Sequence, residues 1–515
     1  MNLRRDLGVL RENTRACVFL ACMVWAPWVR AAPIDWKDPP QGVFEDRWYL
    51  VTVNGQRAGY SRTATKRVGQ TIESLSFIEM AIGRGSAEIK LVLRSLQRET
   101  LTGEPLSFEV EQHMSLATVK KTGVIRDGRV YITSTDQGRS LQTDYPWDPR
   151  SKMAWGIALA TRGEPLAVGK TFELWTYDAL VKPSGPVRTE VRIVSREKID
   201  VLGRRVDAFK AESTTHMGVP ITTISYVDET GADLRMTMDL GFVKAEMIAC
   251  DKEVALAKST TAPELFVQTV VELGRPLDAR AMRRIRYRLH LADKATEGMF
   301  PSTSMQQVVR RDDRMVEIDV RRIDWETLGQ ATSQPLSADL RPYLQASAFL
   351  NADDPAVAAL ARKTVGSEKD PVKMADLLRR CVSTYVDKKD LTVGLASASE
   401  VVRSRQGDCT EHAVLLAAMA RAVGIPARCV GGMVYVSHMA GKEHVFGFHM
   451  WTQVWLAGQW VDIDGALEQT DCDPSHIAMA IMPLNEDGMA DIAVGIIPFI
   501  GKIRIEIVQT EKGEK

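Results

Sequence analysis

The spacing of apolar residues changes character along this chain, and that change constrains what the chain can fold into. From Trp48 to about Val320, apolar residues come in short, alternating, β-type runs separated by turn residues. After residue 350 the period is helical, and the helix-start pair Asp370-Pro371 precedes a stripe of Met374, Leu377, Leu378, Cys381, Val382 and Tyr385. We therefore predict a multidomain protein in which β-rich N-terminal domains are followed by an α+β domain.

A length of 515 residues fits about three domains, since one domain takes roughly 100 to 200 residues. The first strand pattern, Trp48 to Val53, ends at the hairpin signal Asn54-Gly55. Further strand-like runs follow at 187–194, 222–227, 242–249, 265–271, 284–289 and 315–320, before a loop-like stretch at 333–335. The predicted domains are a β-rich N-terminal domain at 36–258, a small β module at 262–345 and an α+β domain at 350–515.

The first 32 residues differ from the rest and indicate a secretory signal peptide. Four arginines precede an apolar stretch at 16–29, and the small residues Ala31 and Ala32 follow it. The stretch is shorter than the ~20 residues that span a bilayer, and Pro27 interrupts it. We expect export to the periplasm or the cell exterior. An uncleaved membrane anchor is the alternative, and Cys22 only weakly resembles a lipidation site.

Charge and cysteine content limit the possible partners. Removing residues 1–31 takes five arginines and two acidic residues from 66 basic and 66 acidic side chains, which leaves 61 and 64. A net charge this close to zero produces no electrostatic attraction that would favour nucleic acid as a partner. Five cysteines remain after removal of the signal peptide, too few for a disulfide scaffold, and an odd number leaves at least one thiol unpaired.

The segment Gly407-Asp408-Cys409-Thr410-Glu411-His412 opens the apolar run 413–420 and predicts a helix. Asp408 is the expected N-cap, Glu411 its capping-box partner, and Gly424 the C-terminal stop. Cys409 then occupies the first helical position. Free backbone N–H groups and the positive end of the helix dipole stabilise a thiolate there, lowering a pKa that is otherwise about 8.5. The N–H of Cys409 could also stabilise an oxyanion, and Tyr385 and Gln406 are candidates for a second donor.

A cysteine nucleophile needs a base and a group that orients the base. His449 begins the strand pattern 449–456, which breaks at Ala457-Gly458 and resumes at 459–464, and this predicts a β-hairpin. If Leu456 pairs with Gln459, Asp464 lies opposite Trp451 and becomes the diagonal same-face neighbour of His449. Asp462 lies on the same face of the strand, so the hairpin alone leaves both carboxylates as candidate orienting groups.

Four ordered blocks resemble the transglutaminase-like superfamily: the 407–412 helix start, the Gly-Ile-Pro-Ala-Arg run at 424–428, the His449-Met450-Trp451 strand and the closing strand at 460–464. The resemblance covers roughly residues 370–470. It implies a papain-like α+β fold with a catalytic triad of Cys409, His449 and Asp464, and it selects Asp464 over Asp462. Animal cross-linking members have Gln and Trp where this chain has Asp408 and Thr410, so bacterial and archaeal members are more similar. The β-rich leader also resembles that of exported bacterial members.

The resemblance implies acyl transfer through a thioester on a protein or peptide substrate, with hydrolysis favoured over amine transfer. Protein cross-linking, or a non-catalytic binding scaffold in the cell envelope, is the alternative. No cofactor is expected, and the oligomeric state is not readable from the sequence. His438, His444 and His449, near Cys429, are spaced by six and five residues, which matches no compact zinc pattern, so no metal site is predicted.

Overall fold

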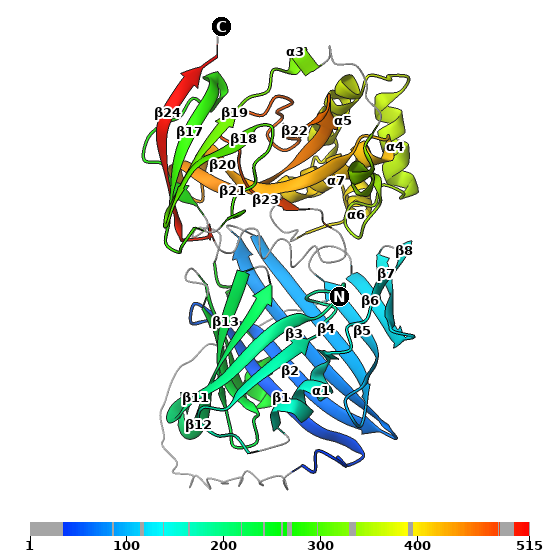
Figure 1. The fold of residues 1–515 in the computed structure, drawn as a ribbon, viewed down its shortest axis with the longest axis vertical. Helices are drawn as coiled ribbons and strands as arrows, with labels where there is room; N and C mark the ends of the chain where they lie inside the picture. The colour runs from blue at the N-terminus through cyan, green and yellow to red at the C-terminus, as the bar shows by residue number, and fades with distance from the viewer. Residues whose placement is uncertain are drawn as a thin grey trace, which may run out of the picture. The chain divides into compact units, whose positions relative to one another are not determined.

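The computed structural model (Figure 1) describes residues 34–513 except for the ranges 85–86, 114–117, 137–138, 163–164, 218, 240–242, 259–260, 265–269, 296, 329–335, 390–394, 483 and 485–498. The predicted signal peptide at 1–32, with its alternatives, lies outside the described residues. So do the predicted loop at 333–335 and most of the predicted run at 265–271.

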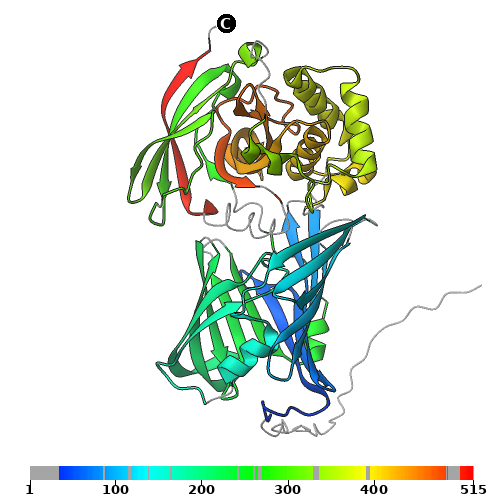
Figure 2. The ribbon, with the colours of Figure 1, turned by 45° about the vertical axis from the view of Figure 1, so that its right-hand side comes forward.

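The N-terminal part of the described chain forms one sheet of 15 strands, in the order β8 to β1 followed by β15 to β9. Neighbours pair antiparallel except β9 and β10, and β1 pairs with β15 where the two halves of the sheet join. The strands are β1 Gly42–Val53, β2 Gln56–Val68, β3 Thr71–Arg84, β4 Ala87–Thr100, β5 Pro105–His113, β6 Thr118–Arg126, β7 Arg129–Asp136, β8 Arg139–Pro146, β9 Ser151–Lys152, β10 Thr171–Thr176, β11 Val187–Val201, β12 Arg204–Met217, β13 Val219–Val227, β14 Asp233–Asp239 and β15 Lys244–Cys250. Figure 2 shows the sheet curled, so that its blue and green strands face each other. This confirms the predicted β-rich N-terminal region.

The first hairpin forms as predicted. Val53 pairs with Gln56, and the two loop residues have positive φ angles, 50° at Asn54 and 77° at Gly55. Two positive φ angles are those of a type I′ turn, whose twist matches that of the flanking strands.

Two helices accompany this sheet, α1 at Ala154–Arg162 and α2 at Lys252–Leu256. The β4 residue Glu99 caps α1, since its carboxylate accepts the backbone N–H groups of Trp155 (2.6 Å) and Gly156 (2.9 Å). Burial raises the pKa of Glu99 to about 7 in spite of these bonds. The helix start is therefore fixed to the sheet wall by a side chain more than 50 residues away.

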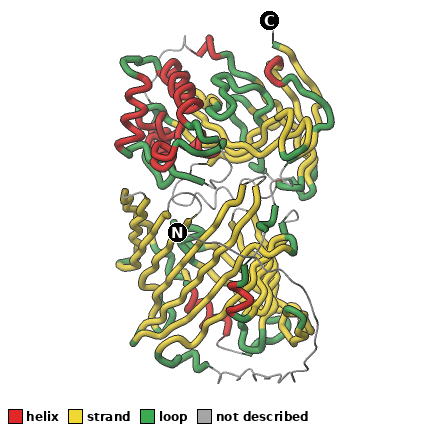
Figure 3. Tube along the Cα trace, turned by 180° about the vertical axis from the view of Figure 1, so that it is seen from behind, coloured by secondary structure: helices red, strands yellow, loops and turns green. Residues whose placement is uncertain are grey.

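A second sheet carries the predicted hairpin. Its order is β16-β21-β20-β23, and β22 also pairs with β21. The strands are β16 Val271–Glu272, β20 Ala427–Met439, β21 Lys442–Leu456, β22 Gln459–Ile463 and β23 Ile477–Met482, and the helices of this region are α4 Pro355–Val365, α5 Pro371–Tyr385, α6 Ala398–Ser404 and α7 Cys409–Ala422. Figure 3 shows these helices, in red, gathered to one side of the strands. Helix α7 is central, because residues 411–421 are all buried, and Thr452 of β21 donates to the Ala413 carbonyl at 3.0 Å.

Helix α5 begins as predicted, with Asp370 as N-cap and Pro371 at the first position. Most of its predicted apolar stripe faces the core, including Met374, Leu378 and Val382. Leu377 is the exception: it is 37 % exposed, because the core-facing surface of α5 includes Ala375 in its place.

A four-stranded sheet packs beside the second sheet, in the order β18-β19-β17-β24. Its strands are β17 Met282–Leu291, β18 Gln306–Asp312, β19 Met315–Arg321 and β24 Ile503–Lys512; the short helices η2 Ala279–Ala281, α3 Trp325–Leu328 and η3 Ala338–Leu344 lie nearby in sequence. The C-terminal strand β24 pairs with β17, and Tyr287 of β17 packs edge-on against Phe446 of β21. The module and the α+β region thus share a core. The domain boundaries given above stay a prediction.

Strand β17 carries several arginines and alternates buried with more exposed residues. Ile285, Tyr287 and Leu289 are fully buried, while Arg284 and Arg286 pair with Asp319 on β19. No helix among the described residues is long and apolar enough to cross a bilayer.

Candidate active site

The start of α7 is built by its own sequence. Asp408 accepts a hydrogen bond from the Thr410 N–H at 2.9 Å, and the Glu411 carboxylate accepts the Asp408 N–H at 2.9 Å, completing the predicted capping box. Gly407 precedes it with φ 153°, and a Cβ there would collide with the Glu411 side chain. Burial raises the pKa of Glu411 to about 8. Cys409 is therefore fixed at the first position of the helix.

The five cysteines of the described chain are not disulfide-bonded, and they differ in environment. Cys409 is partly exposed, whereas Cys429 and Cys472 are fully buried. Burial raises the pKa of both buried thiols to about 12. Of these three, Cys409 is the one whose position suits attack on a substrate from solvent.

The hairpin that carries His449 has the predicted register. Leu456 pairs with Gln459, and the pairing runs on to Thr452 opposite Ile463, so Asp464 follows on the face of His449. The loop residues Ala457 (φ 53°) and Gly458 (φ 79°) form a two-residue turn. His449 Nε2 lies 2.6 Å from Asp464 Oδ2, and both side chains are buried. The contact predicted between base and orienting group is present.

This contact determines which imidazole nitrogen is available. A carboxylate only accepts hydrogen bonds, so Nε2 of His449 donates and Nδ1 is left as the basic atom. The first turn of α7 packs against the same segment, because a Cβ built on Gly465, next to Asp464, would lie 3.6 Å from the Cβ of His412. Helix start, histidine and carboxylate are thus brought to one place by α7, β21 and the end of β22.

Hydrogen bonds fix both the side chain and the backbone of Asp464. Its Oδ1 accepts the N–H groups of Ala466 (2.7 Å) and Leu467 (2.9 Å), and its backbone exchanges two hydrogen bonds with Gln469. Burial alone would raise the pKa of Asp464, but the neighbouring histidines overcome this and hold it well below its usual range. The group is a rigid, ionised carboxylate.

His476, which sequence reasoning did not select, is the second histidine on Asp464. Its Nε2 lies 3.2 Å from Asp464 Oδ2, and its Nδ1 lies 3.1 Å from the Asp473 carbonyl oxygen. Both partners only accept, so both ring nitrogens donate and the ring is an imidazolium. Burial opposes that charge, but Cys472, Asp464 and Asp473 raise the pKa of His476 well above its ordinary value. His476 is therefore a buried cation that helps to fix Asp464.

The only local sequence signal for His476 was the turn Asp473-Pro474-Ser475 before it. Asp473 Oδ1 accepts the N–H and the hydroxyl of Ser475 (3.0 and 2.6 Å), the pattern of an Asx turn. That pattern predicts a turn but not the contact with Asp464, which arises when β23 joins β20.

We expect the substitution His476→Gln to lower the free energy of unfolding by roughly 3 kcal/mol at pH 5.5, because it removes one partner of a buried ion pair. The folded-state pKa of His476 is raised, so its stabilising contribution is complete below about pH 6.5 and is lost as pH rises through the raised value. The difference between wild type and variant should therefore shrink at pH 9. Urea denaturation at both pH values measures it.

His290→Gln is the matched control, because His290 pairs with Glu506 while its side chain is 34 % exposed. We expect a change under about 1 kcal/mol there. An His476→Gln difference that stays constant from pH 5.5 to pH 9 would contradict the imidazolium assignment.

The other carboxylate considered as orienting group and the tyrosine considered as second oxyanion donor form hydrogen bonds elsewhere. Asp462 Oδ1 accepts the Gln453 side-chain amide at 2.6 Å rather than His449. The Tyr385 hydroxyl donates to the Val402 carbonyl at 2.8 Å, so its proton is engaged away from any oxyanion. His412, on the first turn of α7, is a packing residue: its Nδ1 lies 2.5 Å from the Asp408 carbonyl oxygen, and burial lowers its pKa.

The zinc grouping considered from the sequence is not brought together. His438 pairs with Glu443 on the surface, and His444 bonds the Tyr435 hydroxyl. Within the described part of the chain, the trio with ligand atoms close enough for a metal is His449, Asp464 and His476, all within 4.8 Å. Both imidazoles already use Asp464 Oδ2 as their hydrogen-bond acceptor, so this donor set is satisfied without an ion.

Comparison with known proteins identifies a family for part of this chain. Residues 358–465 match the family model described as the transglutaminase-like superfamily. This chain therefore carries a transglutaminase-like domain, which contains Cys409, His449 and Asp464.

Curated relatives include an uncharacterised protein of Mycobacterium tuberculosis (strain H37Rv) and one of Mycobacterium bovis, each 26 % identical over 150 residues. The match covers 25 % of this chain and 48 % of each relative, so the chain spans about half the length of the curated relatives it matches.

Among solved structures, similarity is found to a "Putative Cysteine Protease" from Cytophaga hutchinsonii, with 16 % identity and a TM-score of 0.31 over 45 % of this chain and 90 % of that one. A β-barrel-like protein of a domain of unknown function from Brucella abortus matches with 12 % identity and a TM-score of 0.31 over 41 % of this chain and 96 % of its own.

Proposed function

We propose that the protein is an exported cysteine-nucleophile enzyme that acts on peptide or carboxamide bonds through a thioester. The observation that carries the proposal is the buried bond of 2.6 Å between His449 and Asp464, which leaves Nδ1 of His449 free to act as base beside the helix that begins at Cys409. A base, an orienting group and a thiol at a helix start are the parts that nucleophilic catalysis requires.

In the proposed reaction, Nδ1 of His449 takes the proton of the Cys409 thiol, and the thiolate sulfur attacks the substrate carbonyl carbon. The tetrahedral oxyanion collapses, the C–N bond breaks, and the imidazolium returns the proton to the leaving amine. A thioester to Cys409 remains. Water, deprotonated by His449, then attacks the thioester, so that a carboxylic acid leaves and the thiol is restored.

Hydrolysis is favoured over amine transfer because water needs no second binding site. Protein cross-linking would require an amine donor to enter the same site, and the described residues reveal no determinant of that choice. A non-catalytic scaffold in the cell envelope is the third possibility. Export through the segment at 1–32, and with it a periplasmic or extracellular location, is part of the proposal.

Thiol alkylation against pH tests the nucleophile directly. We expect iodoacetamide to label Cys409 selectively well below pH 8.5, the region where an ordinary thiol is protonated. Mass spectrometry of the modified peptides should find Cys429 and Cys472 unlabelled, because they are buried and burial raises their pKa to about 12.

His449→Ala should weaken that labelling and move it to higher pH, whereas His444→Ala on the same strand should leave it unchanged. Labelling that is indifferent to His449, or that avoids Cys409, would support the scaffold reading. If Cys409 labels as expected, incubation with peptide amides and with added amine separates hydrolysis from transfer.

A further inference from the structure

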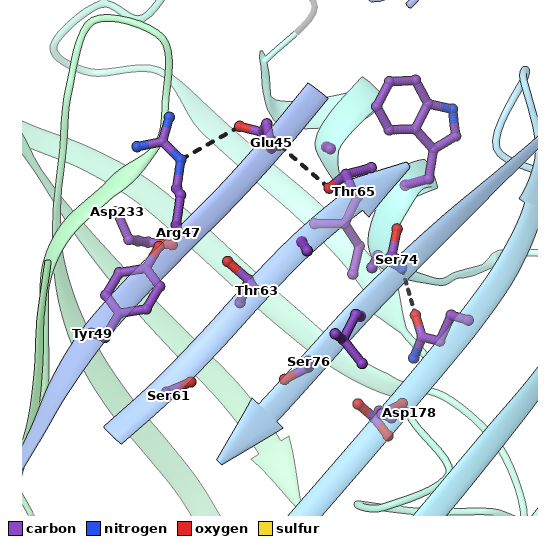
Figure 4. A pocket seen from close by; sticks show the side chains of 18 of the residues that line it. Glu45, Arg47, Tyr49, Ser61, Thr63, Thr65, Ser74, Ser76, Asp178 and Asp233 are labelled. Atoms are coloured by element: carbon purple, nitrogen blue, oxygen red, sulfur yellow. Dashed lines mark hydrogen bonds and ion pairs between the residues drawn. The ribbon is translucent and has the colours of Figure 1, made fainter. Parts of the chain in front are cut away.

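The curled N-terminal sheet encloses a cavity of about 420 Å³, separate from the triad residues. Its volume lies within the roughly 300–1,000 Å³ of small-molecule sites. Figure 4 shows side chains of β1, β2 and β3 lining one wall. Residues of α1, including Trp155 and Arg162, also line the cavity.

The wall is polar because of the strand register. Side chains alternate between the two faces of a strand, so residues paired across neighbouring strands form rows on one face. Two such rows face the cavity: Glu45, Thr65, Ser74 and Gln97, and beside it Arg47, Thr63, Ser76 and Ser95. An inner wall of hydroxyl groups is unlike an ordinary apolar barrel core and provides both hydrogen-bond donors and acceptors.

Two polar atoms in the second row are buried without a hydrogen-bond partner among the described residues, Ser95 Oγ and Arg47 Nε. Ser95 is only 2 % exposed. Unpaired buried polar groups are costly and rare, and each calls for an explanation such as an absent ligand.

The charges of the cavity favour an anion near Arg47. Glu45 is engaged by Arg162 through bonds of 3.0 and 3.2 Å, while Arg47 Nε lies 3.6 Å from the same carboxylate, beyond hydrogen-bonding distance. Two further carboxyls line the cavity, Asp178 and Asp233, and burial raises the pKa of each toward its neutral form. Arg47 thus keeps only a long ion pair to Glu45, whereas Arg162 holds the same carboxylate by two hydrogen bonds.

We propose that this cavity binds a short peptide-like molecule through its free carboxylate at Arg47, with its amide groups along the hydroxyl row to Ser95. Four strands at about 4.8 Å spacing give the row a length of roughly 14 Å, the length of about four extended residues. Backbone amides alternate donors with acceptors, which serine and threonine hydroxyls can match. The planar guanidinium suits a carboxylate. The inference does not depend on the chemistry of Cys409.

Calorimetric titration of the full chain with N-acetyl-trialanine and with its C-terminal amide tests the proposal. The protein carries Cys409→Ala, so that the proposed catalytic cysteine cannot consume the probe. We expect the carboxylate to bind at least about tenfold more tightly than the amide, since the two differ only at the proposed Arg47 contact. Maltose is the comparison ligand, because a hydroxyl-lined cavity could instead select a sugar.

Arg47→Met should remove the preference for the peptide with a free carboxylate over the peptide amide. Ser95→Ala should weaken the binding of both peptides. The matched control is Arg62→Met, because Arg62 lies on β2 next to Thr63, faces outward and pairs with Asp46. Equal binding of acid and amide, a preference that survives Arg47→Met, absent peptide binding at millimolar concentration, or binding of maltose alone would each overturn the proposal. If Arg47→Met fails to fold by circular dichroism, Ser95→Ala and the acid–amide comparison decide.

Discussion

Replacing Cys409 with alanine is expected to reduce hydrolysis of peptide or amide substrates by about 1,000-fold or more, because no other group in the site can form the thioester. The fold should be unaffected, since Cys409 is partly exposed and the capping box that starts α7 uses Asp408 and Glu411 instead. Initial rates on a library of peptide amides, followed by mass spectrometry, measure the effect, and circular dichroism confirms the fold.

Cys381→Ala is the control for this variant. Cys381 is likewise partly exposed and not disulfide-bonded, but it lies on α5, where it accepts a hydrogen bond from Thr364 at 3.2 Å. Its loss should leave the rate within about twofold, as for a surface substitution away from the site. Comparable rates for Cys409→Ala and wild type would exclude the thioester mechanism and favour the scaffold.

The substitution Asp464→Asn should cost both activity and stability. An amide in place of the carboxylate no longer fixes Nε2 of His449 as the donor, and loss of an orienting carboxylate in such a triad lowers turnover by roughly 10³- to 10⁴-fold. The same change leaves the imidazolium of His476 without its Asp464 partner, which should lower the free energy of unfolding by about 3–5 kcal/mol.

The stabilising effect of Asp464 has its own pH dependence. Its folded-state pKa is depressed, so the contribution is present above an unfolded value of about 4 and is lost as pH falls through the depressed value. The gap in stability between wild type and Asp464→Asn should therefore be full at pH 6 and narrow in strong acid. Urea denaturation at several pH values in this range measures the effect on stability. Reaction rates measured under conditions where both proteins remain folded measure the effect on activity.

Asp462→Asn is the matched control, two residues earlier on the same face. The Asp462 carboxyl accepts a hydrogen bond from the Gln453 side-chain amide, and burial raises its pKa. The side-chain oxygen of an asparagine can accept the same hydrogen bond. We expect nearly unchanged rates. Should Asp462→Asn abolish activity while Asp464→Asn retains it, the orienting group would be the rival carboxylate.

Much of the site could be predicted because its geometry is local in sequence. The capping box joins residues three apart, and the two-residue turn at Ala457-Gly458 fixes the register of its hairpin, which carries His449 to Asp464. Family resemblance selects Asp464 over Asp462, because both carboxylates share one face of the strand. The hydrogen bonds of the folded chain agree with that choice.

Other features depend on contacts between distant segments, and no local pattern encodes them. His476 meets Asp464 only after β23 pairs with β20, β24 meets β17 across more than 200 residues, and the rows that line the N-terminal cavity require four strands in register. The helix start at Cys409, the hairpin of His449 and the β-to-α order of the chain can be predicted from local sequence, because turns, caps and periodicity act over a few residues. Which buried charges meet and which polar side chains share a cavity follows from the folded arrangement of distant segments, because burial and electrostatic pairing depend on distance in space.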